Sequence, residues 1–406
     1  MGSDQLRPAR VPGDQLTEYG RAVNRHFYES EADEDVRPWV EAFDTGYRAW
    51  WVRAGDRVVA NLGVIETDLS LPGGGRLPVA GITAVGVAQT MRRRGLLRTL
   101  MRAGLDEAQA RGEPLAALFA SESAIYGRFG FGPAVPHIAY RVDRARLRFL
   151  DPVDVRLVEQ TTPEAAAASW PAIHERLREQ RGGSIGVTAA MWRMAVLEDP
   201  PGWRDGATAR QLVEVPGRGY ARYRVKEGGD WTTADGTVAL AELVATDPEA
   251  ESALWQHVCD LDLTTRTTTW LRPPDDALPH LVADPLALGA LAGPPMYVRV
   301  LDVERLLTSR SYATTGGVRL AVVDPDERAG GCWQLEVGPD GASCEATTAD
   351  PHLVLPVDVL ASVAFGGVRA TTLRAARRLD ERRAGAAAAL DRLLAVDAAP
   401  WSTTEF

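Results

Sequence analysis

Three consecutive arginines and a glycine, Arg92 to Gly95, are the residues of this sequence whose types most directly indicate binding chemistry. A β-branched run precedes them, and apolar residues at helical spacing follow over residues 96–110. The first turn of such a helix presents unpaired N–H groups at the positive end of the helix dipole. Gly95 lets a ligand approach the backbone, and guanidinium groups are charge-assisted donors suited to a pyrophosphate. The stretch therefore predicts an anion site at a strand-to-helix turn.

Two other residues could move protons. Tyr126 lies in a loop rich in glycine and phenylalanine, and its phenol is neutral at pH 7, so it could donate a proton. The chain ends on Phe406, and the aromatic side chains of Trp401 and Phe406 would be wasted in solvent. A docked terminus would bring a free α-carboxylate into the protein, a group that is ionised at pH 7 because its ordinary pKa is about 3.3–3.7.

The first third of the chain supplies the elements that would position these groups. Helices are predicted before residue 47, then a hairpin over 50–60, a strand over 61–71 and a central strand over 79–88. The helix over 96–110 leads to a buried strand over 115–120 and a short helix with Tyr126. This order places Tyr126 toward the end of a strand that neighbours the arginine turn.

The remaining chain forms two further segments. Over residues 150–290 strands and helices alternate, with helices predicted over 163–180 and 248–261. No basic glycine turn follows the central strand of this segment, over 238–246. From residue 297, strand patterns precede helices rich in alanine and leucine, predicted over 353–364 and 373–395.

Composition limits the class of protein. The 406 residues are 45% hydrophobic and 25% charged, which is typical of a soluble globular protein with two or three domains. A net charge of −10 disfavours nucleic-acid binding and fits a cationic substrate with an anionic cofactor. Three cysteines and scattered histidines predict a reducing compartment and no metal site. Without a signal peptide or a spanning apolar run, we expect a cytoplasmic protein without membrane contact, with export by another route left open.

The arginine turn resembles the acetyl-CoA motif of the GNAT acetyltransferases, V-x-V-x-x-x-x-[QR]-x-x-G-x-[GA]. Val85, Val87, Arg92 and Gly95 occupy its positions, and Leu97 stands where the motif has a small residue. An ordinary basic strand-to-helix turn is the alternative interpretation of this stretch.

A second stretch of sequence indicates a narrower family. Residues 125–133, Ile-Tyr-Gly-Arg-Phe-Gly-Phe-Gly-Pro, are similar to the corresponding stretch of the Eis family, actinobacterial N-acetyltransferases of aminoglycosides and lysines. The two matches occur in the order of a GNAT core, so the chain is identified as resembling this family throughout its length.

The resemblance implies an α/β (α+β) fold with two tandem GNAT-like folds and a sterol-carrier-protein-like C-terminal domain. The implied domains are a catalytic one over residues 1–150, a degenerate GNAT-like one over 151–292 and the sterol-carrier-like one over 293–406. The C-terminal tail would reach the active site. A bacterial homohexamer, a dimer of trimers, is also implied, and for the last domain both packing and lipid binding stay open.

The resemblance further implies acetyl-CoA as co-substrate, with no metal, in a direct acetyl transfer. Tyr126 would be the general acid and the Phe406 carboxylate the general base. Backbone groups of Val85 and Val87 would polarise the thioester carbonyl. The residues expected to bind acetyl-CoA are Val85, Gly86, Val87, Arg93, Arg94, Gly95, Leu96, Leu97, Arg98, Ser121 and Glu122.

The expected acceptor is a small-molecule amine or a lysine-bearing polycation. Glu405 and the acidic run over residues 29–35 would hold its ammonium by charge, and Trp39 by cation–π contact. The same run would also suit a solvated loop. Two other function classes stay open: a lipid- or ligand-binding protein with a relic acetyltransferase core, and a regulatory module that binds CoA thioesters without turnover.

Overall fold

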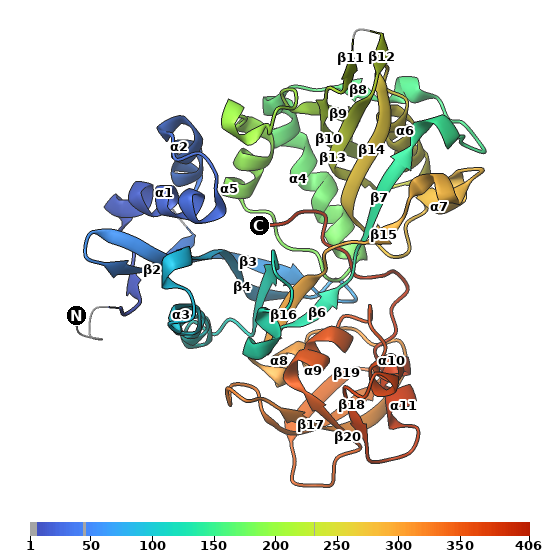
Figure 1. Ribbon diagram of the computed structural model, residues 1–406. Helices are drawn as coiled ribbons and strands as arrows, with labels where there is room; N and C mark the ends of the chain where they lie inside the picture. The colour runs from blue at the N-terminus through green and yellow to red at the C-terminus, as the bar shows by residue number, and fades with distance from the viewer. Residues whose placement is uncertain (1–5, 44–45, 231) are drawn as a thin grey trace. The chain divides into compact units, whose positions relative to one another are not determined.

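The computed structural model describes residues 6–43, 46–230 and 232–406. The chain divides into two compact units (Figure 1). The first unit holds the residues up to Ala134, Met296–Asp397 and Phe406. The second holds Val135–Pro295 and Ala398–Glu405. Within the described part of the chain, no helix has the length and apolarity needed to cross a bilayer.

The first sheet has the strand order β1-β2-β3-β4-β5-β16-β6. Its strands are β1 Ala9–Arg10, β2 Tyr47–Ala54, β3 Arg57–Ser70, β4 Arg76–Val87, β5 Leu115–Phe119, β6 Gly132–Val135 and β16 Met296–Val300. The predicted hairpin is β2 with β3, and the predicted central strand is β4. Both predictions are confirmed.

Three helices accompany this sheet: α1 Leu16–Phe27, α2 Asp33–Ala42 and α3 Leu96–Ala110. Helix α3 has the predicted bounds, because Leu96, Leu100 and Leu105 return to one buried face that packs on β3 and β4. The loop interpretation of residues 29–35 is wrong for the second half of the run. Its acidic residues there form the first turn of α2, where negative charge stabilises a helix.

The second sheet has the order β15-β7-β14-β13-β10-β9-β8. Its strands are β7 Ile138–Asp143, β8 Glu159–Gln160, β9 Gln211–Val215, β10 Gly219–Lys226, β13 Gly236–Ala245, β14 Thr264–Arg272 and β15 Leu291–Ala292. A separate ribbon joins β11 Gly229–Asp230 to β12 Thr233–Ala234. The helices are α4 Pro163–Gln180, α5 Ala189–Trp192, α6 Pro248–Cys259 and α7 Leu278–Leu281. Helices α4 and α6 confirm the two predicted helices of this segment.

The last part of the first unit forms a sheet of order β19-β18-β17-β20-β21. Its strands are β17 Gly316–Val323, β18 Gly331–Gly338, β19 Gly341–Ala346, β20 Leu353–Pro356 and β21 Asp380–Glu381, with helices α8 Val303–Thr308, α9 Val357–Val363, α10 Ala370–Ala375 and α11 Ala386–Leu393. The helix predicted over 353–364 is wrong at its start, because Leu353–Pro356 pairs in parallel with β17. The helix predicted over 373–395 is interrupted by β21.

The two large sheets are completed by strands from outside their own stretch of sequence. Strand β7 follows β6 in the chain but pairs with β14 of the second sheet. Strand β16 follows Val135–Pro295 of the second unit but lies between β5 and β6 of the first sheet. Figure 1 shows it beside β6. The domain boundaries expected near residues 150 and 292 stay predictions.

Candidate active site

Strands β4 and β5 are paired over only part of their length. They pair in parallel from Val79 opposite Leu115 to Gly81 opposite Ala117. Beyond that point β5 keeps only its other partner, β16, with which it pairs from Leu115 to Phe119, while β4 continues to Val87 alongside β3. We call Gly81–Val87 and Ala117–Phe119 the first fork. Backbone groups of β4 on its β5 side therefore pass beyond their strand partner, where an extended ligand can hydrogen-bond to them.

A β-bulge lies on β4 within the first fork. Asn61 pairs with Gly86 and Gly63 with Thr83, so Ala84 and Val85 both stand opposite one residue of β3. Ala84 has a φ of 49°, which is unfavourable for a side chain other than glycine's. Such bulges re-aim backbone groups, often beside active sites.

A short relay of side chains braces the bulge. The fully buried Asn61 donates from Nδ2 to the carbonyl oxygen of Ala84, and its Oδ1 hydrogen-bonds to Nδ1 of His26 on α1. Gly86 makes room for this relay, because a Cβ there would lie 2.9 Å from the Cβ of His26 and 3.0 Å from Oδ1 of Asn61. Burial lowers the pKa of His26, which favours its neutral form. Sequence reasoning missed both residues, although Asn61 is the one polar residue in the run Val58–Val64.

The arginine turn leads directly into α3. Gly95 is the N-cap of the helix, with a φ of 80°, and no side chain caps the helix N-terminus. The first turn of α3 carries no acidic residue. Arg92, Arg93 and Arg94 are exposed, and their guanidinium groups make no ion pair with any described residue. The N–H groups of this turn and its arginines are thus available to an external anion, and the anion site itself stays a prediction.

The neighbouring leucines anchor the turn. Leu96 is buried in the core below α3, and Leu97 packs partly against the same cluster. Leu97 stands where the acetyl-CoA motif has a small residue. Its larger side chain packs against the core, which accounts for a leucine at this position. Arg98, one residue on, is exposed.

Tyr126 begins a short 3₁₀ helix, Tyr126–Phe129, after β5. Its side chain is 8% exposed and meets Phe131 edge-to-face, with ring centroids 6.2 Å apart. Burial and the nearby charge of Glu122 raise the pKa of the Tyr126 phenol, so it keeps its proton at pH 7. Its hydroxyl has no hydrogen-bond partner in the described ranges. Ser121 and Glu122 are exposed at the end of the strand.

The loop after Tyr126 is held by close backbone packing. A Cβ at Gly132 would lie 1.8 Å from the carbonyl oxygen of Asp358 on α9, and one at Gly130 would lie 2.8 Å from Nε of Arg299. Arg299 is itself fixed by a fully buried ion pair with Asp324, at 2.7 Å. The C-terminal part of the first unit therefore forms a firm backing for the Tyr126 loop.

The terminal residue lies at the first fork. The ring of Phe406 meets Phe119 edge-to-face, with centroids 5.8 Å apart. Its Cε2 would be 3.1 Å from a Cβ at Gly81, so the absence of a side chain there makes room for the ring. Phe406 thus packs where β4 and β5 separate.

The two residues expected to bind the acceptor have different surroundings. Trp39 packs among aromatic rings, stacked on Tyr19 at 6.0 Å and edge-on to Tyr47 at 4.9 Å. Glu405 is exposed, and partial loss of hydration raises the pKa of its carboxyl against the opposing charge of Arg222. A substrate role for either residue stays a prediction.

Known domain families match three parts of the chain. Residues 7–134 and residues 183–300 each match an acetyltransferase (GNAT) domain. Residues 303–403 match a sterol carrier protein domain. The tandem GNAT-like folds and the sterol-carrier-like domain implied by the sequence are confirmed.

Complete relatives match over nearly the same length. An N-acetyltransferase of Streptomyces coelicolor is 39% identical over 363 residues, which cover 86% of this chain and 87% of the relative. The N-acetyltransferase Eis of Mycobacterium tuberculosis is 33% identical over 361 residues, which cover 87% of each chain. The crystal structure of Eis1 from Mycobacterium abscessus superimposes with a TM-score of 0.81 at 30% identity, covering 99% of this chain and 100% of that one.

GNAT domains take acetyl-CoA as co-substrate, and the described residues fit that molecule. The bulged strand β4 offers backbone groups for an extended chain, and the uncapped, arginine-rich N-terminus of α3 suits a pyrophosphate. Shared domains, sequence identity and fold over most of the chain lead to one conclusion. The protein is an N-acetyltransferase of the Eis family.

Proposed function

We propose that this enzyme transfers the acetyl group of acetyl-CoA to amino groups of polycationic acceptors, namely aminoglycosides and lysine side chains. The observation that carries the proposal is the packing of the terminal Phe406 ring on Gly81 and Phe119. A chain terminus at the first fork brings an ionised carboxylate beside the strand that would hold the thioester. An ammonium acceptor needs such a group, because it must lose a proton before its nitrogen can attack.

The binding of acetyl-CoA is assigned to the bulged strand and the arginine turn. Backbone N–H groups of Val85 and Val87 would donate to the thioester oxygen, on which negative charge develops as the amine attacks. Gly95, Arg93 and Arg94 would hold the pyrophosphate. Gly86, Leu96, Leu97, Arg98, Ser121 and Glu122 would line the rest of the acetyl-CoA site.

Tyr126 is assigned the role of general acid. When the carbon–sulfur bond breaks, the CoA sulfur leaves as a thiolate and must gain a proton. Burial and the charge of Glu122 raise the pKa of Tyr126, so its hydroxyl carries a proton to give at neutral pH. Its lack of a described hydrogen-bond partner supports a hydroxyl available to the substrate.

The Phe406 carboxylate is assigned the role of general base. The acceptor nitrogen loses two protons in the reaction. The carboxylate would take the first from the ammonium and release it to solvent, and the second would restore the proton that Tyr126 gives to the CoA sulfur. An α-carboxylate is a weak base in water, and removal of water from the filled site would raise its basicity. Glu405 and Trp39 would hold the acceptor ammonium by charge and by cation–π contact.

The assembly and the other partners are part of the same proposal. We expect a homohexamer, a dimer of trimers, that acts on amines and neither on nucleic acid nor at a membrane. Light scattering of the purified enzyme measures the mass, and a monomer would contradict the expected assembly.

The test is release of CoA thiol from acetyl-CoA, with kanamycin or a lysine peptide as acceptor. Wild type is compared with a variant lacking Phe406 and with one carrying an additional C-terminal glycine. The additional glycine keeps the ring but moves the carboxylate by one residue. Activity that collapses in both variants supports the terminal base. Activity that survives in both would move the base to an internal carboxylate.

A further inference from the structure

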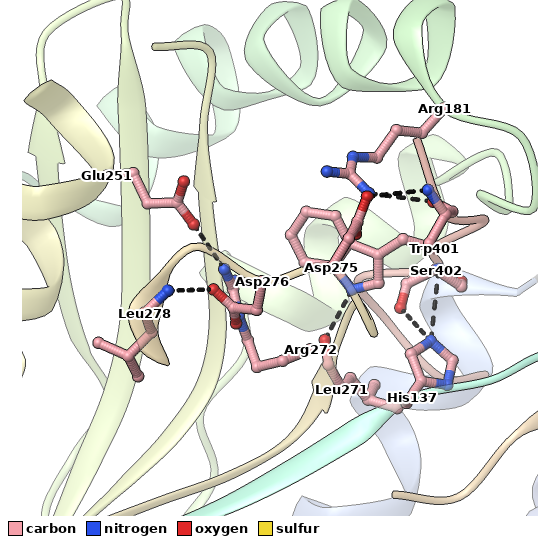
Figure 2. A network of polar contacts seen from close by, with 11 residues as sticks. His137, Arg181, Glu251, Leu271, Arg272, Asp275, Asp276, Leu278, Trp401 and Ser402 are labelled. Atoms are coloured by element: carbon pink, nitrogen blue, oxygen red, sulfur yellow. Dashed lines mark hydrogen bonds and ion pairs between the residues drawn. The ribbon is translucent and has the colours of Figure 1, made fainter. Parts of the chain in front are cut away.

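The last residues of the chain are held firmly by the second unit, to which Ala398–Glu405 belong. Trp401 is 5% exposed and donates from its indole Nε1 to the carbonyl oxygen of Leu271 on β14, at 2.7 Å (Figure 2). Its backbone N–H donates to the carbonyl oxygen of Gly182 at 2.9 Å. Both N–H donors of this large aromatic residue are therefore satisfied inside the second unit.

The buried guanidinium of Arg272 stacks on one face of the Trp401 indole ring. The guanidinium carbon of Arg272 lies 4.7 Å from the centroid of the Trp401 ring. Arg272 is 2% exposed and donates to Asp276 at 2.7 Å and to Glu251 at 2.8 Å (Figure 2). The two carboxylates orient the guanidinium, so the ring stacks on a fixed cation.

Three further hydrogen bonds flank Trp401 in the sequence. Before it, Ala399 donates from its N–H to Asp275 at 2.9 Å, and its carbonyl oxygen accepts from Arg181 at 3.0 Å. After it, the carbonyl oxygen of Ser402 lies 2.9 Å from Nε2 of the buried His137 (Figure 2). Ser402, Thr403 and Thr404 are buried as well. This run of fixed residues differs from the mobile polar end that most domains have.

The place that Trp401 occupies has a counterpart in the first sheet. Strands β13 and β14 pair in parallel as far as Ala239 opposite Thr268, as β4 and β5 do as far as Gly81. Continuing that register would bring Leu243 opposite Arg272. Instead the Arg272 side chain donates to the Leu243 carbonyl oxygen at 2.6 Å. We call Ala239–Leu243 and Thr268–Arg272 the second fork.

The first fork is the place assigned to acetyl-CoA, whereas the second fork is filled by Arg272 and capped by Trp401. We propose that the second GNAT-like fold uses its fork as a socket for the chain's own C-terminal segment. Trp401, Arg272 and His137 are then positioning residues for the Phe406 carboxylate. This inference rests on the proposed function, in which that carboxylate is the general base.

Chain geometry links the socket to the carboxylate. With Ser402 fixed at His137, four residues remain to the terminus, and these can reach at most about 14 Å. Thr404, still buried, shortens the free length further. The socket therefore keeps the carboxylate within about 14 Å of Ser402 before any substrate binds, and a confined group needs less ordering to react than a free one.

The experiment measures the position of the tail and the reaction separately. Carboxypeptidase A releases a C-terminal aromatic residue, so the rate at which free phenylalanine appears reports exposure of Phe406. Wild type is compared with Trp401→Ala, with Trp401→Phe, which keeps a ring but loses the indole N–H, and with His137→Phe. Trp333→Phe, in β18 of the first unit, is the control. Near-UV circular dichroism and Tm identify any variant that fails to fold, and His137→Phe keeps the test decisive if Trp401→Ala does.

In Trp401→Ala and His137→Phe we expect Phe406 release at least tenfold faster than in wild type. We also expect kcat at least tenfold lower, a KM for acetyl-CoA within twofold, and partial recovery of both rates in Trp401→Phe. In a chain lacking Phe406, Trp401→Ala should lower kcat no further, since both changes act through one group. Release as slow as in wild type from folded variants would overturn the socket. Fast release with full kcat would overturn the positioning role together with the terminal base.

Discussion

The strand-to-helix turns of the two GNAT-like folds differ in what balances the positive end of the helix dipole. Helix α3, which follows β4, has Gly95 as its N-cap residue, so no side chain caps its first N–H groups. Three exposed arginines precede Gly95, and the first turn of the helix carries no acidic residue. After β13, α6 starts at Asp247, whose side chain caps the N–H of Ala250, and Glu249 follows in the first turn. Arg218 pairs with both acids, at 2.6 and 2.8 Å. The second turn holds its own anions, so it has no need of a ligand.

The forks repeat this contrast. Both sheets keep a register shift on the central strand, at Ala84 in the first and beside Glu242 in the second. In the second fork, however, the Arg272 side chain hydrogen-bonds to Leu243 where the other fork offers free backbone. The comparison teaches that two GNAT domains can offer different backbone and charge at equivalent places without a change of fold. Internal side chains take over the interactions that a ligand would otherwise satisfy.

The largest effect should come from Tyr126, the proposed general acid. Tyr126→Phe should lower kcat by about 10²–10⁴-fold with little change in KM for acetyl-CoA, because general-acid catalysis typically contributes this much. The matched control is Tyr223→Phe in the second sheet, whose hydroxyl hydrogen-bonds to His257 at 3.1 Å and should leave kcat unchanged. Steady-state kinetics checks both variants. Full kcat in Tyr126→Phe would remove the general acid from the mechanism.

The second largest effect is expected at Asn61, whose side chain hydrogen-bonds to the bulge on β4. Asn61→Leu leaves the Ala84 carbonyl without its donor, so the backbone N–H groups assigned to the thioester lose their fixed direction. We expect kcat to fall by about 10–10²-fold, less than the loss of a whole oxyanion donor would cost. Asn61→Asp keeps the shape but cannot donate, and it should behave like Asn61→Leu. Wild-type kcat in folded Asn61→Leu would show that the bulge needs no brace.

A charge placed at the open turn should weaken acetyl-CoA binding. Gly95 has open space around its Cβ position, so a side chain fits there, and aspartate and asparagine both tolerate positive φ. Gly95→Asp imitates the acidic cap of α6 and should raise the KM for acetyl-CoA about tenfold, whereas Gly95→Asn should change it far less. Titration calorimetry with CoA measures the difference. Equal affinities of the two variants would mean that charge at this turn is irrelevant.

The smallest effect is expected at the closed turn. Asp247→Asn keeps a capping group but loses the charge pair with partly exposed Arg218, so at pH 7 unfolding should become easier by about 0.5–1 kcal/mol. The hydrogen bond from Arg218 lowers the pKa of Asp247. Its stabilisation is therefore complete above the ordinary value of about 3.9 and is lost as pH falls through the lowered pKa. Urea unfolding should show a larger difference at pH 7 than at pH 2, and a difference of equal size at both would contradict this.

Much of the fold was predictable from local signals. The bounds of α3 and α4 follow from apolar spacing between clear start and stop residues, Gly95 and Gly112 for the first and Thr162 for the second. The start of the predicted helix over 353–364 failed because Leu-Val-Leu-Pro is a short apolar run, which periodicity cannot distinguish from a buried strand. Its identity as β20 depends on pairing with a distant strand, β17.

The candidate site divides in the same way. The arginine turn and Tyr126 lie in contiguous motifs, so the sequence was sufficient to propose them. The partners that brace or anchor the site were not found, because His26 meets Asn61 and His137 meets Ser402 only after folding, the second pair across 265 positions of sequence. No local pattern encodes a contact of that separation.

The interleaving of strands has a consequence for synthesis. Strand β16 pairs with the whole length of β5, yet the ribosome makes it only after Val135–Pro295 of the second unit. At about 5–20 residues per second, the apolar edge of β5 waits roughly ten to thirty seconds for its partner. An unpaired hydrophobic edge invites association with other chains. The yield of native enzyme should therefore depend on translation speed and on chaperones that shield this one strand of the nascent polypeptide.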